Sequence, residues 1–139
     1  MAPILKSRTR PRRSGAVAIE YGFVLPVLLL FIFEIIDIGR LLWTFTTLSR
    51  ATEAAARCAA VNSTACANAG LIQNYAVGEA WGLDVTAAAF TVTQPACGKQ
   101  VSATYTFQFV IPWFYGTSTF GSANTMTLST TACYPPQYP

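Results

Sequence analysis

The sequence has no histidine among its 139 residues, and only 11% of its residues are charged, against about 25% in an average soluble domain. Without histidine, the chain cannot form a Ser-His-Asp or Cys-His catalytic set, or a metal site with imidazole ligands. It also lacks a glycine-rich loop of the kind that holds phosphate groups. These absences argue against an enzyme and imply neither a cofactor nor a metal centre.

Charge is scarce in most of the chain because the basic residues are concentrated at its start. Beyond Val61 the only charged residues are Glu79, Asp84 and Lys99. Five of the nine Lys and Arg residues lie in the first thirteen positions, namely Lys6, Arg8, Arg10, Arg12 and Arg13. Since such a terminal tag is not a basic stripe on a folded surface, we expect no nucleic-acid partner.

An apolar run follows this basic tag. The stretch 21–33 is uncharged, and the segment 16–38 is long enough to cross about 30 Å of hydrocarbon. The positive-inside bias predicts a cytoplasmic N-terminus and an exported C-terminal part. A cleaved secretory signal peptide is the alternative, but its cleavage site needs small residues just past the apolar run. The chain has no alanine between Ala18 and Ala51, so we do not favour this cleavage.

Glu20 is an ionisable residue near the start of the apolar run. Such a residue is costly to insert into a membrane, so it normally has a partner or a function. One interpretation is that its carboxylate merely reaches the membrane interface. Its surroundings favour a function, because Gly15 follows the basic tag, Glu20 lies five residues further on, and Tyr21 comes directly after it.

This arrangement resembles the type IV prepilin signal in the form found in Tad (tight adherence) pili. The residues that follow are similar to the TadE-like pseudopilin domain, and the resemblance covers about residues 14–60. It is carried by the apolar run and by Pro26, Glu34, Gly39, Arg40 and the alanine-rich stretch 51–57. Asp37, an extra acid beside Glu34, departs from the family pattern and leaves the pairing at this membrane exit open.

The resemblance implies that a prepilin peptidase cuts between Gly15 and Ala16 and leaves the apolar helix in place. Ala16 would then carry a cationic amine. In related pilins the glutamate, here Glu20 followed by Tyr21, is thought to neutralise that amine on a neighbouring subunit during assembly. The implied partners are other pilin subunits, the prepilin peptidase, the inner-membrane assembly platform and membrane lipid.

Between Ala16 and Ala60 only Pro26 and Gly39 argue against a single helix, which would be roughly 65–70 Å long. Pro26 removes a backbone hydrogen bond and predicts a kink or a local opening. The resemblance implies that the helix bends or melts there on entering a filament, and a static kink is the alternative. The outer half has helical charge spacing, with Asp37 three residues before Arg40, Arg50 three before Glu53, and Glu53 four before Arg57.

The C-terminal part, residues 61–139, is rich in Thr, Ala, Ser and aromatic residues. Apolar and polar residues alternate from Val101 to Ile111, which predicts a half-buried strand. Further strands are expected at 84–93 and 124–133, with Met126 and Leu128 inward, and a short helix at 68–82 with Leu71, Tyr75 and Ala76 on one face. Since three antiparallel strands with one apolar face need a cover, we predict a pilin-like α+β fold in which the outer half of the long helix packs on the sheet.

A cluster of aromatic residues follows the clearest strand and predicts a loop. It either contacts another subunit, the membrane or a target surface, or folds back over the open face of the sheet, which we favour. The loop contains Trp113, Phe114, Tyr115 and Phe120.

Four cysteines lie beyond the apolar run, and none are in CxxC spacing. Disulfides suit an oxidising compartment and a small core, and three connectivities are possible. We favour Cys58–Cys66 closing the end of the helix and Cys97–Cys133 joining strand ends.

These observations predict three parts: a basic leader that is removed (1–15), a transmembrane and stalk helix (16–60) and an exported, disulfide-linked β domain (61–139). The function they favour is that of a minor pilin of a Tad-type pilus, needed for pilus assembly, surface adherence or biofilm formation. Such a protein would cross the inner membrane once, with a cytoplasmic N-terminus, and could reach the cell surface after assembly. The alternative is a permanently anchored binding module that is not assembled into a filament.

Overall fold

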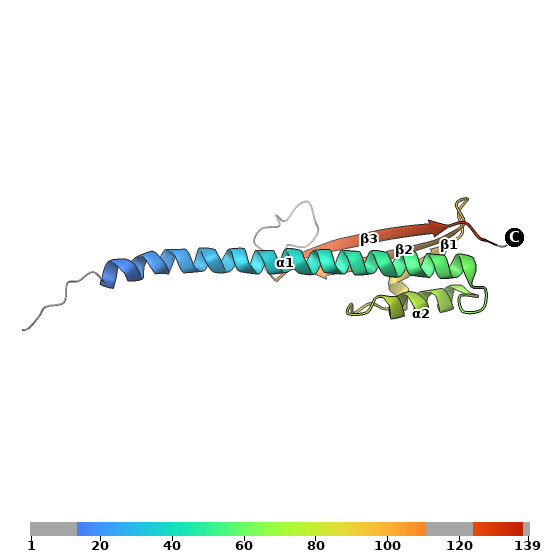
Figure 1. Cartoon of the computed structure of the whole chain (residues 1–139), viewed down its shortest axis with the longest axis horizontal. Helices are drawn as coiled ribbons and strands as arrows, with labels where there is room; N and C mark the ends of the chain where they lie inside the picture. The colour runs from blue at the N-terminus through green and yellow to red at the C-terminus, as the bar shows by residue number, and fades with distance from the viewer. Residues whose placement is uncertain (1–13, 111–123, 138–139) are drawn as a thin grey trace, which may run out of the picture.

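The computed structural model describes residues 14–110 and 124–137. It is an α+β fold, as predicted, with one long helix and a small antiparallel sheet. Figure 1 shows α1 as a rod whose N-terminal half projects away from the other elements, which pack along its C-terminal half. In chain order the elements are α1 (Ser14–Val61), α2 (Ala69–Glu79), a 3-10 turn (Ala87–Ala89), β1 (Phe90–Thr93), β2 (Lys99–Gln108) and β3 (Thr125–Tyr134).

The three strands form an antiparallel sheet in the order β1-β2-β3. β3 pairs with β2 along its whole length, whereas β1 pairs only with the stretch 100–103. One face of the sheet is apolar and turned to the helices, as the alternation in the sequence predicts. Its buried side chains include Phe90, Val101, Ala103, Phe107 and Leu128.

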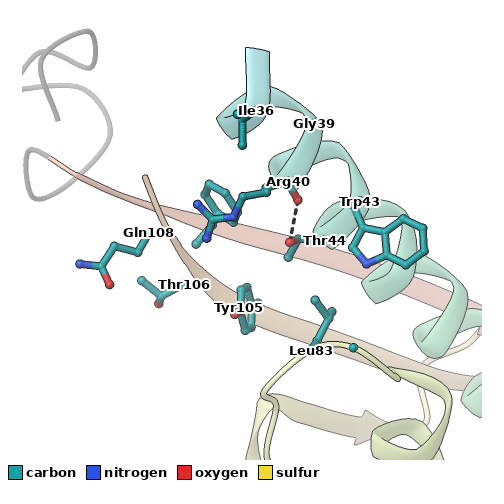
Figure 2. Close-up of a pocket in the computed structure, with 11 residues that line it drawn as sticks. Ile36, Gly39, Arg40, Trp43, Thr44, Leu83, Tyr105, Thr106 and Gln108 are labelled. Atoms are coloured by element: carbon teal, nitrogen blue, oxygen red, sulfur yellow. Dashed lines mark hydrogen bonds between the residues drawn. The ribbon is translucent and has the colours of Figure 1, made fainter. Parts of the chain in front are cut away.

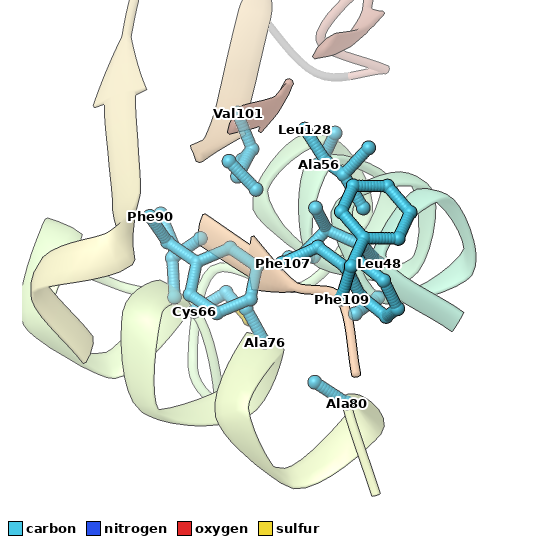
Figure 3. Packing of buried hydrophobic residues seen from close by; sticks show 14 residues of the cluster. Leu48, Ala56, Cys66, Ala76, Ala80, Phe90, Val101, Phe107, Phe109 and Leu128 are labelled. Carbon is cyan, nitrogen blue, oxygen red and sulfur yellow. The ribbon is translucent and has the colours of Figure 1, made fainter. Parts of the chain in front are cut away.

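Helix α1 packs on this face through small and aliphatic residues. Leu48, Ala51 and Ala55 recur at helical spacing and are fully buried, and the small side chains allow the helix backbone to approach the sheet closely. Figure 3 shows Leu48 and Ala56 of α1 near the rings of Phe107 and Phe109, at and just beyond the end of β2, with Ala76 and Ala80 of the α2 region on the other side of the cluster.

Helix α2 is where expected, but it is rotated relative to the prediction. Asn68 caps it, its side chain accepting a hydrogen bond from the Leu71 N–H at 2.9 Å. Ile72 and Ala76 are buried, whereas Leu71 and Tyr75 are 42% and 40% exposed. The three residues predicted to share one face are therefore divided, because Ala76 forms the buried stripe with Ile72, four residues earlier, whereas Leu71 and Tyr75 lie on the exposed side.

The predicted strand 84–93 is shorter than expected. Residues Ala87–Ala89 form a 3-10 turn, and the strand begins only at Phe90. Alanine has low strand propensity, whereas the Phe-Thr-Val-Thr stretch is rich in strand-forming residues. The strand expected from Val101 to Ile111 begins earlier, at Lys99, and ends at Gln108. Ile111 itself lies outside the described residues.

Helix α1 is continuous through Pro26, and Figure 1 shows no sharp kink in it. Proline removes one hydrogen bond, and the turns on either side still hold the helix together. Pro26 therefore neither interrupts nor sharply kinks α1 in this structure.

Two disulfides close the end of the molecule farthest from the start of α1. They join Cys58 to Cys66 and Cys97 to Cys133, which is the pairing that the sequence favoured. Beside the second disulfide, Gly98 adopts φ +121°, and a Cβ there would overlap the carbonyl oxygen of Tyr134. Only glycine fits this turn, because the backbone at the end of β3 passes directly against it.

We expect the two disulfides to contribute unequally to stability. The Cys97–Cys133 bond closes a sequence separation of 36 residues and the Cys58–Cys66 bond one of 8. Loop-closure entropy predicts a loss of about 4 kcal/mol for Cys97→Ser with Cys133→Ser, against about 2.5 kcal/mol for Cys58→Ser with Cys66→Ser. Denaturant unfolding of the two double variants in detergent micelles measures this, and equal losses would contradict the expectation.

Candidate functional site

A buried carboxylate lies near the middle of α1, where the helix meets the end of the sheet. The Asp37 side chain is 1% exposed. Its Oδ1 accepts a hydrogen bond from Arg40 Nη1 at 2.9 Å, and its Oδ2 accepts one from the backbone N–H of Val110 at 2.8 Å. The guanidinium of Arg40 lies 5.4 Å from the centre of the Phe107 ring. We refer to Asp37, Arg40, Phe107 and Val110 as the Asp37 cluster.

The Asp37 cluster explains how a charge is tolerated in this position. A buried carboxylate is costly unless its oxygens are hydrogen-bonded and its charge is balanced. Both oxygens of Asp37 have partners, and Arg40 supplies the opposite charge from one turn further along α1. The extra acid that left the pairing open in the sequence is therefore the residue that pairs with Arg40 and ties α1 to the end of β2. Glu34, one turn earlier, is half-buried.

The other charge pairs expected on the outer half of α1 are not formed. Within residues 14–110 and 124–137, Asp37 and Arg40 make the only ion pair. Arg50, Glu53 and Arg57 are all exposed, so water competes with the weak attraction between them. Spacing alone therefore predicted one of the three pairs correctly.

The N-terminal half of α1 is exposed on all sides. From Val17 the helix is long and apolar enough to cross a membrane; its most apolar window has a mean hydropathy of 2.3 and is 6% buried. This indicates a single-pass membrane protein. Glu20 and Tyr21 both lie on this exposed half, and no basic side chain of the described residues is within ion-pair distance of Glu20.

Gly15 lies in the first turn of α1, and the fold does not require a glycine there. It has no positive φ, and a Cβ added to it would meet nothing within 4 Å. Glycine inside a helix costs about 0.5–1 kcal/mol relative to alanine. Gly22 and Gly39 are equally open. The chain's own packing therefore gives no reason for these three glycines.

Two grooves flank Trp43, which projects from α1 and is 53% exposed. The first, of about 680 Å³, lies between α1, the end of β2 and the loop at Leu83, and Figure 2 shows Arg40 and Tyr105 among its walls. The second, of about 670 Å³, runs between α1 and the end of α2. Where the grooves meet, the rings of Trp43 and Trp81 are in edge-to-face contact with centroids 5.9 Å apart. No sequence pattern had singled out this pair, because its members are 38 residues apart and belong to different elements.

The surface of the C-terminal part is almost uncharged. The sheet face turned away from the helices carries only uncharged polar side chains and Cys133, among them Thr91, Ser102, Thr104, Thr106 and Thr127. On α2, the negative charge of Glu79, with burial and a hydrogen bond to the same carboxylate, raises the pKa of Tyr75 above its ordinary value. The phenol therefore remains neutral to higher pH than usual.

The described residues contain no group of three His, Cys, Asp or Glu side chains that could hold a metal ion, and the four cysteines are consumed in disulfides. The aromatic loop residues singled out in the sequence lie outside the described residues. These are Trp113, Phe114, Tyr115 and Phe120.

Comparison with known proteins gives one match. Residues 15–57 match the family model of TadE-like proteins, which confirms the resemblance inferred from the sequence over this segment. The match begins at Gly15, includes the whole apolar run and Asp37, and ends four residues before the end of α1. No curated protein and no solved structure matches the chain. The match covers less than half of the chain and links its N-terminal helix to the TadE-like proteins of Tad pilus systems.

We expect the Asp37 carboxylate to be needed for attachment of the sheet to α1. Asp37→Ala would leave the Val110 N–H without its acceptor and Arg40 without its counter-charge, lowering the free energy of unfolding by about 2–3 kcal/mol. Asp37→Asn, which keeps an oxygen acceptor, should lose less. Chemical denaturation in detergent micelles measures both, with Asp84→Ala as the control at an exposed acid. A loss no larger than that of the control would show that the cluster does not stabilise the fold.

Proposed function

We propose that the chain is a minor pilin, or pseudopilin, of a Tad-type pilus. In this proposal a prepilin peptidase removes residues 1–15, α1 holds the protein in the inner membrane, and the C-terminal part is exported. The protein then enters, or primes, a pilus needed for surface adherence or biofilm formation. Its partners are other pilin subunits, the peptidase and the inner-membrane assembly platform.

The observation that carries the proposal is the unpacked N-terminal half of α1. This half projects away from the sheet in Figure 1, and its side chains are exposed, apolar and interrupted by Glu20. A lone helix of this kind needs either lipid or other helices around it. Glu20 supports packing against other helices, because its carboxylate has no basic partner among the described residues and is suited to pair with a cation from another subunit.

Gly15 supports the processing step. Its backbone and surroundings in α1 would accept another residue, so recognition by a peptidase is a better reason for glycine than folding is. Cleavage after Gly15 would create a new amine at Ala16, four residues before Glu20. One turn of helix separates the two groups, so an Ala16 amine and a Glu20 carboxylate on neighbouring, staggered subunits could pair.

The distribution of charge and cysteine supports the proposed orientation. The basic residues precede α1, which favours a cytoplasmic N-terminus. All four cysteines follow the apolar run and form disulfides, as expected in an oxidising compartment. The nearly uncharged C-terminal surface suits a part that is covered by neighbouring subunits, since a free domain normally relies on charge for solubility.

The alternative function is a permanently anchored binding module. The second groove beside Trp43 and the aromatic residues beyond β2 would then serve a ligand outside the membrane. A static anchor, however, has no use for Gly15 or for Glu20. The two functions are therefore separated by experiments on these two residues.

Cleavage is tested by co-expressing the protein with a Tad-type prepilin peptidase and measuring its intact mass and N-terminal sequence. We expect a new N-terminus at Ala16 in the native chain and none in Gly15→Leu. The matched control is Gly22→Leu, which changes a second open glycine of the same helix and should leave cleavage intact. An uncut native chain would favour the anchored module.

Assembly is tested by Glu20→Gln, which keeps the size of the side chain and removes its charge. We expect normal membrane insertion and cleavage but at least a tenfold loss of the protein from sheared pili, since about 1.4 kcal/mol of lost pairing already changes an equilibrium tenfold. Glu53→Gln, at an exposed glutamate on the outer half of the same helix, is the control. Equal recovery of both variants in pili would show that assembly does not need the charge of Glu20.

A further inference from the structure

The exposed surface of α1 remains uncharged well beyond the Asp37 cluster. The sequence has no charged residue between Arg40 and Arg50, and large apolar side chains continue to face outward along this stretch. Leu42 is 59% exposed and Phe45 is 44% exposed. Arg40 is itself exposed, but between it and Arg50 the exposed side chains of α1 are uncharged, so charge returns to the exposed surface only at Arg50.

This length exceeds the hydrocarbon core of a bilayer and reaches past one headgroup layer. From Val17 to Phe45 the helix contains 29 residues, or about 43 Å at 1.5 Å per residue. A bilayer is about 30 Å thick in its hydrocarbon core and about 40–45 Å thick with its headgroup layers. With Val17 at the inner edge of the hydrocarbon core, an untilted α1 would leave that core near Ile36. Arg40, about 35 Å from Val17, would then lie within the outer headgroup layer, and Trp43, about 39 Å from Val17, at its outer edge.

The Trp43–Trp81 pair lies at this level. Trp43 is 53% exposed and Trp81, just beyond the end of α2, is 68% exposed. Helical side chains lean toward the N-terminus, so the indole of Trp43 leans toward the membrane. Because the two rings are in contact, Trp81 lies at the same depth but on a second element, to the side of the helix.

We infer that Trp43 and Trp81 dock the C-terminal part on the lipid headgroup layer of the outer leaflet, with Arg40 at the same level. Tryptophan prefers this layer because its ring is apolar and its N–H can still find polar partners. The pair would fix the tilt and rotation of the sheet above the membrane, which a single helix alone does not do. This inference rests on the membrane-spanning part of the proposed function and on none of its steps of cleavage or assembly.

The depth of each indole is measured with the full-length protein in vesicles of phosphatidylethanolamine and phosphatidylglycerol. Trp113→Phe removes the third tryptophan, and Trp43→Phe or Trp81→Phe added to it leaves a single reporter. Spin-labelled lipids with the label near the headgroup or at the chain end quench fluorescence at those depths, and iodide quenches from water. Far-ultraviolet circular dichroism verifies that each variant is folded.

We expect both reporters to be quenched more by the shallow label than by the deep label. We also expect iodide to quench each of them much less in vesicles than in the protein unfolded by denaturant. Strong iodide quenching with little quenching by either lipid, for one or both tryptophans, would overturn the inference. So would stronger quenching by the deep label. Flotation of the same vesicles tests the membrane span separately, and no peptidase is present, so a failure of the proposed cleavage would leave this result unaffected.

Discussion

The whole molecule depends on one constraint, which is that a single unbroken helix must suit two different environments. Along its first half α1 presents apolar side chains in every direction, and nothing in the described chain covers them. Along its second half, one side becomes a seam of alanine, threonine and leucine that packs on the sheet. Large residues would hold the sheet away from the helix, so the small ones determine how closely β2 and β3 can approach. The rest of the fold is built on that seam.

The Asp37 cluster lies at the point along α1 where the exposed apolar half ends and the half that packs on the sheet begins. A carboxylate that receives hydrogen bonds from the guanidinium of Arg40 and the N–H of Val110 is a directional attachment, unlike the apolar contacts further along. It fixes the end of β2 at one turn of α1. The hydrophobic seam alone would tolerate sliding by a turn, because alanines recur at that spacing, whereas one buried charge has only one acceptable partner geometry.

The sequence was sufficient for features that are local or periodic. Hydropathy and the scarcity of helix breakers predicted α1, strict alternation predicted β2, and helical spacing predicted the Asp37–Arg40 pair. Sequence patterns failed where contacts with distant parts of the chain determine the structure. The rotation of α2 follows from which side of it meets the core, and the alanines before Phe90 form a turn because no partner strand holds them extended. The bond from Val110 to Asp37 and the contact of Trp43 with Trp81 join residues far apart in the chain, which no local pattern reveals.

The placement of the disulfides has a mechanical consequence. Both lie at the end of the molecule farthest from the start of α1, whereas the near end is held by the Asp37 cluster without a covalent bond. Helix and strands run along a common long axis (Figure 1), so tension applied along α1 would load the helix–sheet contacts and the ten paired residues of β2 and β3 in shear. Many contacts must then break together, and the residues inside the loops closed by Cys58–Cys66 and Cys97–Cys133 cannot be drawn out to their full length. The C-terminal part is therefore built to stay folded under a pull along its length, with its weakest attachment at the near end.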